Sequence, residues 1–352
     1  MRRERIRYAR SADGVRIAWA ASGQGPQTLV LPPNQVTDIE RDWESPMTGP
    51  VLARLSEHFR VVRYDQRGCG SSQRDVARHG AAAQVEDLEA VVAGAGIDGP
   101  FVLLAISGAS IYGAIYVATH PDRVSHFVGY GVAPCGAQAG GLHDEVTRYT
   151  ALVDTVRIGW EASFSASRML AANYLILDLS AEEAAWQDTH APLAANAADA
   201  GRVLAAGMDA DARPWLGQIT TPTLILHAEQ DGCILPEWAR GYAAAIPGAQ
   251  YVEVPGRNHV LLARDPGFEP FMGHLLDFVG PAPAAALTGL SPRERQILDG
   301  VGAGLSNEAI ALVNGISPKT VRNHLTRVYD KLGVLSRTQA ALVAKGDRAA
   351  MP

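Results

Sequence analysis

The stretch "LLAISGASIYG", Leu103 to Gly113, places two serines directly after an apolar run. The run begins at residue 101 as "FVLLAI" and has the length and composition of a strand that is buried on both faces. The small residues that follow it favour a tight turn into a helix. Open parallel sheets place ligands and chemistry at such strand ends. Ser107 and Ser110 are therefore both candidates for a reactive position.

Apolar runs and helical patterns alternate on both sides of this stretch. The runs predict strands at 15–21, 27–32, 59–65, 101–106, 124–131, 222–228 and 249–255. Helical patterns lie between most of them, at about 84–95, 109–119, 236–245 and 267–279. This alternation predicts the α/β class, with a mostly parallel sheet covered by helices on both faces. The interval of about 136–215 is Ala-rich and helical in pattern, and it predicts a helical cap over one end of the sheet.

The composition is that of an ordinary globular chain. The 352 residues are 47% hydrophobic and 19% charged, which suggests two or three domains. No apolar run approaches the roughly 18 residues of a membrane span, and the basic N-terminus lacks the apolar stretch of a signal peptide. The three cysteines, Cys69, Cys135 and Cys233, are too widely spaced for a disulfide framework or a metal cluster. We expect no metal, no cofactor, no membrane partner and a cytoplasmic location.

A linker and a change of charge divide the chain. The stretch "GPAPAAALTG", Gly280 to Gly289, is rich in Pro and Ala without periodicity. From Thr288 to Pro352 the chain has nine Lys and Arg against five Asp and Glu, whereas the whole chain carries a net charge of −6. The sequence therefore predicts an acidic domain at 1–280, a linker at 281–287 and a basic domain at 288–352, of which only the last would attract nucleic acid.

Two further polar residues follow predicted strand ends. Asp231 lies in "HAEQDGCILP" and His259 lies in "PGRNHVLL". A serine hydroxyl becomes a nucleophile when an imidazole accepts its proton, and a carboxylate fixes that imidazole. Taken singly, the aspartate could cap a turn and the histidine could be an ordinary loop residue. Their order after Ser107, each at a strand end, favours a catalytic triad.

These residues carry a family resemblance. The order Ser, Asp, His is that of the α/β-hydrolase fold, and "DQRGCGSS" (65–72) and "ATHPDRV" (118–124) are similar to motifs of that family. Residues 8–279 thus resemble an α/β-hydrolase with a cap. In that family the nucleophile lies thirteen residues before the histidine of the "HP" pair, here His120. The resemblance implies Ser107 as nucleophile and places Ser110 in the following helix.

The frame around the serine departs from the family pattern. Ala105 and Ala109 give A-x-S-x-A in place of G-x-S-x-G. Because alanine adds only a methyl group, the turn can still form. This pattern does not decide between a site that hydrolyses its ligand and one that only binds it. The resemblance implies an oxyanion hole that consists of the Gly108 N–H and a second N–H from the loop "PPNQ", at Asn34 or Gln35.

The cap supplies candidate residues for a ligand pocket. Its aromatic residues Trp160 and Tyr174 are candidates for the lining above Ser107, although most aromatic residues in such a segment serve packing alone.

The C-terminal stretch reads as four short helices. Serines that can cap a helix precede each of them: Ser291, Ser306, Ser317 and Ser336. The third helix, which Gly333 would end, carries an apolar stripe of Val321, Leu325, Val328 and Leu332 at spacings of four, three and four. Two short helices joined by a Gly-containing turn, the second with a basic outer face, are typical of a helix-turn-helix.

This stretch closely resembles the LuxR/GerE-type domain through "GLSNEAIA", "ISPKTVRNHL" and "YDKLGVLSRTQA". The resemblance implies that the third helix enters the DNA major groove and that the protein acts as a homodimer. The side chains expected at base edges or nearby phosphates are Lys319, Arg322, Asn323 and Thr326, and those expected at the backbone are Thr320, Arg327 and Lys331. The alternative is a small helical bundle with a solvated basic face.

The sequence therefore predicts a LuxR-type transcriptional regulator that binds double-stranded DNA. Its α/β-hydrolase-fold domain would bind a small apolar or ester/lactone-like ligand. The same domain has the groups that hydrolysis of such a ligand requires. One alternative is a serine esterase or lactonase whose main role is hydrolysis. Another is a hydrolase with a vestigial tail that binds no DNA.

Overall fold

The computed structural model describes residues 4–160, 165–280, 287, 289–332, 337, 340–341 and 343–344. The chain divides into two compact units between Leu275 and Leu276. This division falls inside helix α10 (Phe268–Val279), a few residues before the predicted boundary at 280. Apart from Leu287, the predicted linker lies outside the described residues, as do Gly333 and Ser336.

One mixed sheet forms the centre of the N-terminal unit. Its strands are β1 (Arg7–Arg10), β2 (Arg16–Ser22), β3 (Gln27–Leu31), β4 (Phe59–Tyr64), β5 (Phe101–Ile106), β6 (Val124–Tyr130), β7 (Thr223–Ala228) and β8 (Gln250–Val254). They lie in the order β1-β2-β4-β3-β5-β6-β7-β8, and all neighbours from β4 to β8 are parallel. The predicted α/β class is confirmed. Strand β1 was not predicted, because "RYAR" is short and buries one side chain only.

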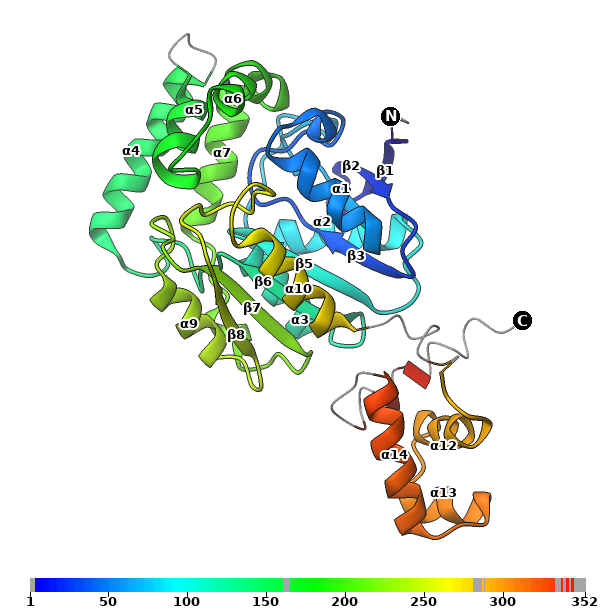
Figure 1. Ribbon diagram of the computed structural model, residues 1–352. Helices are drawn as coiled ribbons and strands as arrows, with labels where there is room; N and C mark the ends of the chain where they lie inside the picture. The colour runs from blue at the N-terminus through cyan, green and yellow to red at the C-terminus, as the bar shows by residue number, and fades with distance from the viewer. Residues whose placement is uncertain are drawn as a thin grey trace. The chain divides into compact units, whose positions relative to one another are not determined.

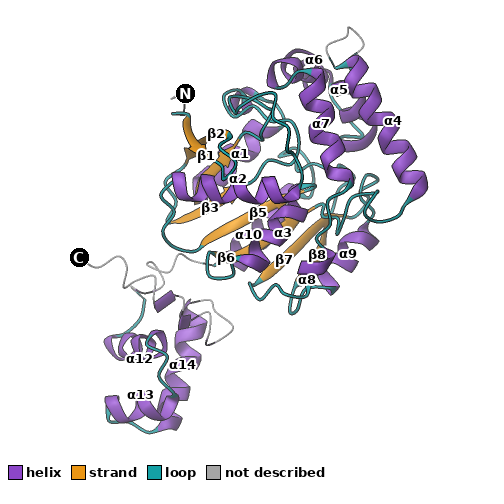
Figure 2. Ribbon diagram, turned by 180° about the vertical axis from the view of Figure 1, so that it is seen from behind, coloured by secondary structure: helices purple, strands orange, loops and turns teal. Residues whose placement is uncertain are grey.

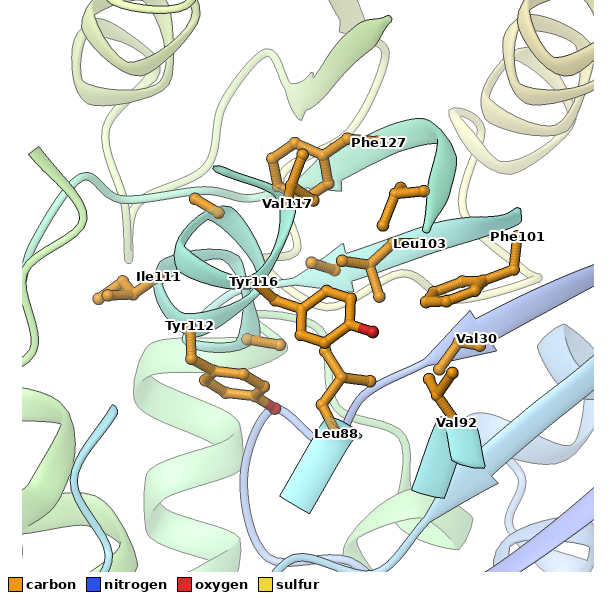
Figure 3. Close-up of a cluster of buried hydrophobic side chains, with 14 of the residues drawn as sticks. Val30, Leu88, Val92, Phe101, Leu103, Ile111, Tyr112, Tyr116, Val117 and Phe127 are labelled. Carbon is orange, nitrogen blue, oxygen red and sulfur yellow. The ribbon is translucent and has the colours of Figure 1, made fainter. Parts of the chain in front are cut away.

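Helices cover both faces of this sheet. Helices α1 (Thr48–His58) and α10 lie in front of the strands in Figure 1. Helices α2 (Ala81–Gly94), α3 (Ala109–Thr119) and α9 (Pro236–Ala244) pack on the other face, which Figure 2 shows from behind. Figure 3 shows Tyr112 and Tyr116 of α3 between Leu88 of α2 and the strand residues Leu103 and Phe127. This cluster fixes α3, and thereby the turn that precedes it.

A group of helices is inserted between β6 and β7. It comprises α4 (His143–Gly159), α5 (Ala166–Leu170), the π-helical η2 (Ala171–Leu175), α6 (Ala181–Ala194), α7 (Ala197–Met208) and α8 (Arg213–Leu216). Helices α4 to α7 gather beyond one end of the strands (Figure 1). Their apolar faces form a second cluster, distinct from the one that covers the sheet, together with Met47, Cys69 and Leu262 from outside the cap. We call α4 to α7 the cap.

The described part of the C-terminal unit contains α12 (Pro292–Gly302), α13 (Asn307–Asn314) and α14 (Pro318–Leu332). Ser291 and Glu294 form the capping box of α12, and Ser306 caps α13. Gly315, at φ 62°, takes the left-handed conformation that ends α13. The predicted stripe of α14 is buried against α12 and α13: Val321, Leu325, Val328 and Leu332. In the described parts of both units, no helix is long and apolar enough to cross a membrane.

Candidate functional site

Ser107 occupies the sharp turn between β5 and α3. Its backbone lies at φ 53°, a left-handed conformation that costs a non-glycine residue of order 1–3 kcal/mol, and such strain is concentrated at functional sites. The surrounding fold holds it there, since its N–H donates to Tyr130 O at 2.9 Å. Ala105 and Ala109 are fully buried on either side, so the strand and helix accommodate their methyl groups. Ser110 is fully buried within α3.

The structure brings three of the predicted site residues together. His259 Nε2 lies 2.7 Å from Ser107 Oγ, and His259 Nδ1 lies 2.7 Å from Asp231 Oδ2. With Nδ1–H donating to the carboxylate, Nε2 is free to accept the serine proton. This is the geometry that a general base requires toward a nucleophile. The arrangement can therefore attack an acyl carbon through Ser107 Oγ.

The carboxylate of Asp231 is held by its own loop. Its Oδ1 accepts N–H groups of Cys233 at 2.8 Å and Ile234 at 3.1 Å. Burial raises the pKa of Asp231, but the hydrogen bonds from His259 and from these two amides outweigh it and leave the pKa below the usual value. Asp231 is thus ionised at neutral pH and can stabilise a His259 imidazolium.

A second histidine supports the same loop. His227 is fully buried on β7, and its Nε2–H donates to Ile234 O at 2.8 Å. The same nitrogen lies 3.5 Å from Asp231 Oδ2. Burial lowers the pKa of His227, which keeps its ring neutral beside the carboxylate. Sequence reasoning missed this residue, because a histidine inside an apolar strand carries no distinctive pattern.

A cavity of about 500 Å³ opens above Ser107, between the sheet and the cap. The proposed oxyanion residues Gly108, Asn34 and Gln35 all line it. Asn34 O lies 3.4 Å from the position of a Cβ atom on Gly108, so the "PPNQ" loop adjoins the start of α3. Apolar and aromatic side chains form much of the remaining wall: Ile111, Tyr149, Leu152, Leu170, Leu204 and Trp238.

One of the two predicted pocket aromatics lies elsewhere. Tyr174 lines the cavity, but Trp160 does not. Trp160 is 4% exposed in the core of the cap, where its Nε1–H donates to Ala191 O at 3.2 Å and Ala195 O at 2.9 Å. It borders a second, smaller cavity of about 140 Å³. The prediction for Trp160 is wrong because its indole serves cap packing.

The thiols of the three cysteines are held in their protonated form. Cys135 and Cys233 line the cavity as free thiols, and Cys69 is buried. Burial raises the pKa of all three, to about 12 for Cys69 and Cys233, so they stay protonated. Within the described residues no cluster of His, Cys, Asp or Glu side chains has a metal-binding arrangement.

Helix α14 presents the predicted polar face. Five of the predicted DNA-contacting side chains are exposed on it: Lys319, Arg322, Asn323, Thr326 and Arg327. Thr320 is half-buried, and its hydroxyl lies 2.8 Å from Ser317 Oγ. Lys331 has another role, because its ammonium donates to Glu294 Oε2 at 2.8 Å and to Gly289 O at 3.2 Å. Lys331 thus ties α14 to the start of α12, and its contact with the DNA backbone stays a prediction.

Comparison with known families agrees with both units. Residues 35–269 match the alpha/beta hydrolase family. The chain belongs to this family. Residues 288–344 match the luxR family of bacterial regulatory proteins. The chain is therefore an α/β-hydrolase unit fused to a LuxR-type helix-turn-helix domain.

Curated relatives are similar to the C-terminal unit. The probable HTH-type transcriptional regulator GfsR of Streptomyces halstedii is 51% identical over 53 residues, which cover 15% of this chain and 22% of that protein. The transcriptional regulatory protein ComA of Bacillus subtilis is 43% identical over 58 residues, which cover 16% of this chain and 27% of that protein. The chain spans only about a quarter of the length of these relatives.

Solved structures are similar to the α/β-hydrolase unit. An enol-lactonase from Burkholderia xenovorans aligns with a TM-score of 0.62 at 21% identity, over 78% of this chain and 99% of that one. An esterase from Exiguobacterium antarcticum aligns with a TM-score of 0.66 at 20% identity, over 77% of this chain and 98% of that one. At these identities the likeness establishes the fold alone.

Proposed function

We propose that this protein is a transcriptional regulator that binds double-stranded DNA through α14 and a small ligand through its α/β-hydrolase unit. The observation that carries the proposal is the fusion itself, in which a LuxR-type domain follows an α/β-hydrolase unit with a large cavity. Ligand binding in the cavity controls the helix-turn-helix domain. We place the protein in the cytoplasm, which fits its free thiols.

The cavity favours an apolar ligand that carries an ester or lactone group. Apolar and aromatic side chains such as Leu152, Leu204 and Trp238 would hold the body of the ligand, and Ser107 and Gly108 would meet its carbonyl. Hydrogen bonds at one end and apolar contacts along the rest are the usual way in which a pocket of this kind orients its ligand.

The exposed residues of α14 support the DNA-binding part. Arginine can bind guanine and asparagine can bind adenine through two hydrogen bonds each, so Arg322 and Asn323 suit base readout. Lys319 and Arg327 add charge for phosphates. We further propose a homodimer, because helix-turn-helix domains commonly read two half-sites.

Selection of bound duplexes from a random-sequence DNA pool by the full-length protein tests this function. We expect a defined site, with log K falling by about 0.9 per phosphate neutralised as log[salt] rises. Failure to retain any duplex at low salt would reject DNA binding. The ligand's role is tested by comparing DNA affinity before and after a fluorophosphonate probe has reacted with Ser107, with probe-treated Ser107→Ala as the control.

Serine hydrolysis is a second candidate function, favoured by the 2.7 Å contacts of His259 with Ser107 and Asp231. Wild-type protein should then cleave p-nitrophenyl esters and react with the fluorophosphonate probe, and Ser107→Ala should do neither. A wild-type protein that neither turns over esters nor becomes labelled is a binding module only.

A further inference from the structure

The backbone of His259 is anchored to the cap. We call residues 257–265 the histidine loop and residues 175–183 the cap segment. His259 N–H donates to Leu175 O at 2.9 Å, and Val260 N–H donates to the same oxygen at 3.5 Å. The backbone of the residue that would act as general base is therefore hydrogen-bonded to the cap.

Asn258 makes this connection specific. It is 2% exposed, and its Oδ1 accepts Leu177 N–H at 2.9 Å. Its Nδ2 donates to Asp178 Oδ1 at 2.9 Å and to Asp265 Oδ1 at 3.1 Å. A buried amide whose donors and acceptor are all used sets one register between two segments, because any slip would leave polar groups unpaired.

Arg264 adds a charged connection between the same two segments. Its guanidinium donates to Glu183 Oε1 at 2.8 Å and to Asp178 Oδ1 at 3.0 Å. Glu183 is almost fully buried and also belongs to the capping box that starts α6. The histidine loop is thus joined to both ends of the cap segment.

The cap segment begins at the wall of the ligand cavity. Leu175, which anchors His259, is the last residue of η2, and both Leu175 and Tyr174 line the cavity. Single π-helical turns are rare and occur frequently at functional sites. A ligand that displaces η2 must therefore displace the peptide to which His259 is bonded.

We propose that Asn258 and Arg264 are positioning residues that tie the histidine loop to the cap segment, so that the position of η2 at the cavity wall sets whether His259 stays hydrogen-bonded to Ser107. This inference deepens the proposed function, on which it rests for the presence of a ligand in the cavity. The hydrogen bond between His259 and Ser107 then depends on what occupies the cavity, since a shift of about 1 Å suffices to weaken the catalytic hydrogen bonds.

The test uses full-length Arg264→Met, with Arg168→Met as the matched control. Arg168 is similarly half-exposed and pairs with Asp188 at 2.9 Å inside the cap, away from the histidine loop. We expect Arg264→Met to slow fluorophosphonate labelling of Ser107 by roughly 10- to 100-fold. Arg264→Lys should slow it less than Arg264→Met, and Arg168→Met should change the labelling rate by no more than about twofold. In a His259→Ala background Arg264→Met should have no further effect, because it acts through that histidine.

Hydrogen exchange supplies a readout that does not need activity. Arg264→Met should raise exchange in peptides covering 257–262 and 175–180, whereas Arg168→Met should not. Asn258→Asp should raise it further, because a third carboxylate would face Asp178 and Asp265. Unchanged exchange in both Arg264→Met and Asn258→Asp overturns the proposal. So does a loss of labelling on Arg264→Met that is equally large with and without His259. If the wild-type protein is not labelled, serine hydrolysis is rejected. Hydrogen exchange alone then tests whether Asn258 and Arg264 tie the histidine loop to the cap segment.

Discussion

The serine site and helix α14 use polar side chains in opposite ways. Ser107, Asp231 and His259 follow three different strands, and the last two are 2% exposed. They satisfy one another's hydrogen bonds. The polar residues of α14 lie within a single helix and face solvent, where an outside partner can reach them. A buried network should fail as a unit when one member is lost, whereas exposed contacts should contribute nearly independently.

The largest effect is expected at the buried site. Asp231→Asn keeps the shape of the side chain but removes the charge that holds His259 in the working tautomer. Labelling of Ser107 should fall by about four orders of magnitude. Asp211→Asn, at an exposed pair with Arg213, is the control and should change the rate little. A loss of less than tenfold for Asp231→Asn would show that the three residues do not work as a unit.

At the exposed site Arg322→Ala should have a smaller effect. Loss of one base-contacting arginine should weaken binding to the selected DNA site by about 1–3 kcal/mol and relax specificity at one base position. Arg240→Ala, on α9 of the other unit, serves as the control in the same binding titration. Unaltered affinity and specificity would remove Arg322 from the DNA interface.

In the described part of the C-terminal unit, the buried Glu294 pairs with the exposed Lys331. The Lys331 ammonium and the Ser291 N–H lower the pKa of Glu294 to about 2 from its usual value near 4.5. Because the folded-state pKa is the lower one, the stabilisation is present above pH 4.5 and is lost as the pH falls toward 2.

Glu294→Gln should therefore cost about 1–2 kcal/mol at neutral pH and flatten this pH dependence. Hydrogen exchange of α12 and α14 in the full-length protein between pH 7 and pH 3 measures both effects. The exposed Asp299→Asn, on α12, is the control. If the two variants respond to pH alike, the Glu294–Lys331 pair does not stabilise the unit.

The smallest expected effect on DNA binding distinguishes Lys319 from Lys331, two lysines of α14. Lys319→Ala should reduce the slope of log K against log[salt] by about 0.9 and weaken selected and unrelated DNA alike, by tenths of a kcal/mol at moderate salt. Lys331→Met should leave that slope unchanged, because its ammonium already binds Glu294. An equal loss of slope in both variants would show that Lys331 contacts a phosphate as Lys319 does.

Local patterns were sufficient wherever one short segment determines the outcome. The helix caps at Ser291 and Ser306 and the stripe on α14 were all predictable, because capping and helical periodicity act within a few residues. The strand ends that carry Ser107, Asp231 and His259 were predictable for the same reason, since apolar runs of strand length precede them. The role of Lys331 was not, since its partner Glu294 lies on another helix.

By itself, the sequence determined the α/β class, the position of the turn at Ser107, the helix-turn-helix and the exposed face of α14. Only the tertiary structure decided which side chains meet. It removed Trp160 from the ligand cavity, added His227 behind Asp231, and joined Asn258 and Arg264 to the cap segment. The physical reason is that periodicity and capping are properties of neighbouring residues, whereas a buried hydrogen bond depends on where distant segments come together.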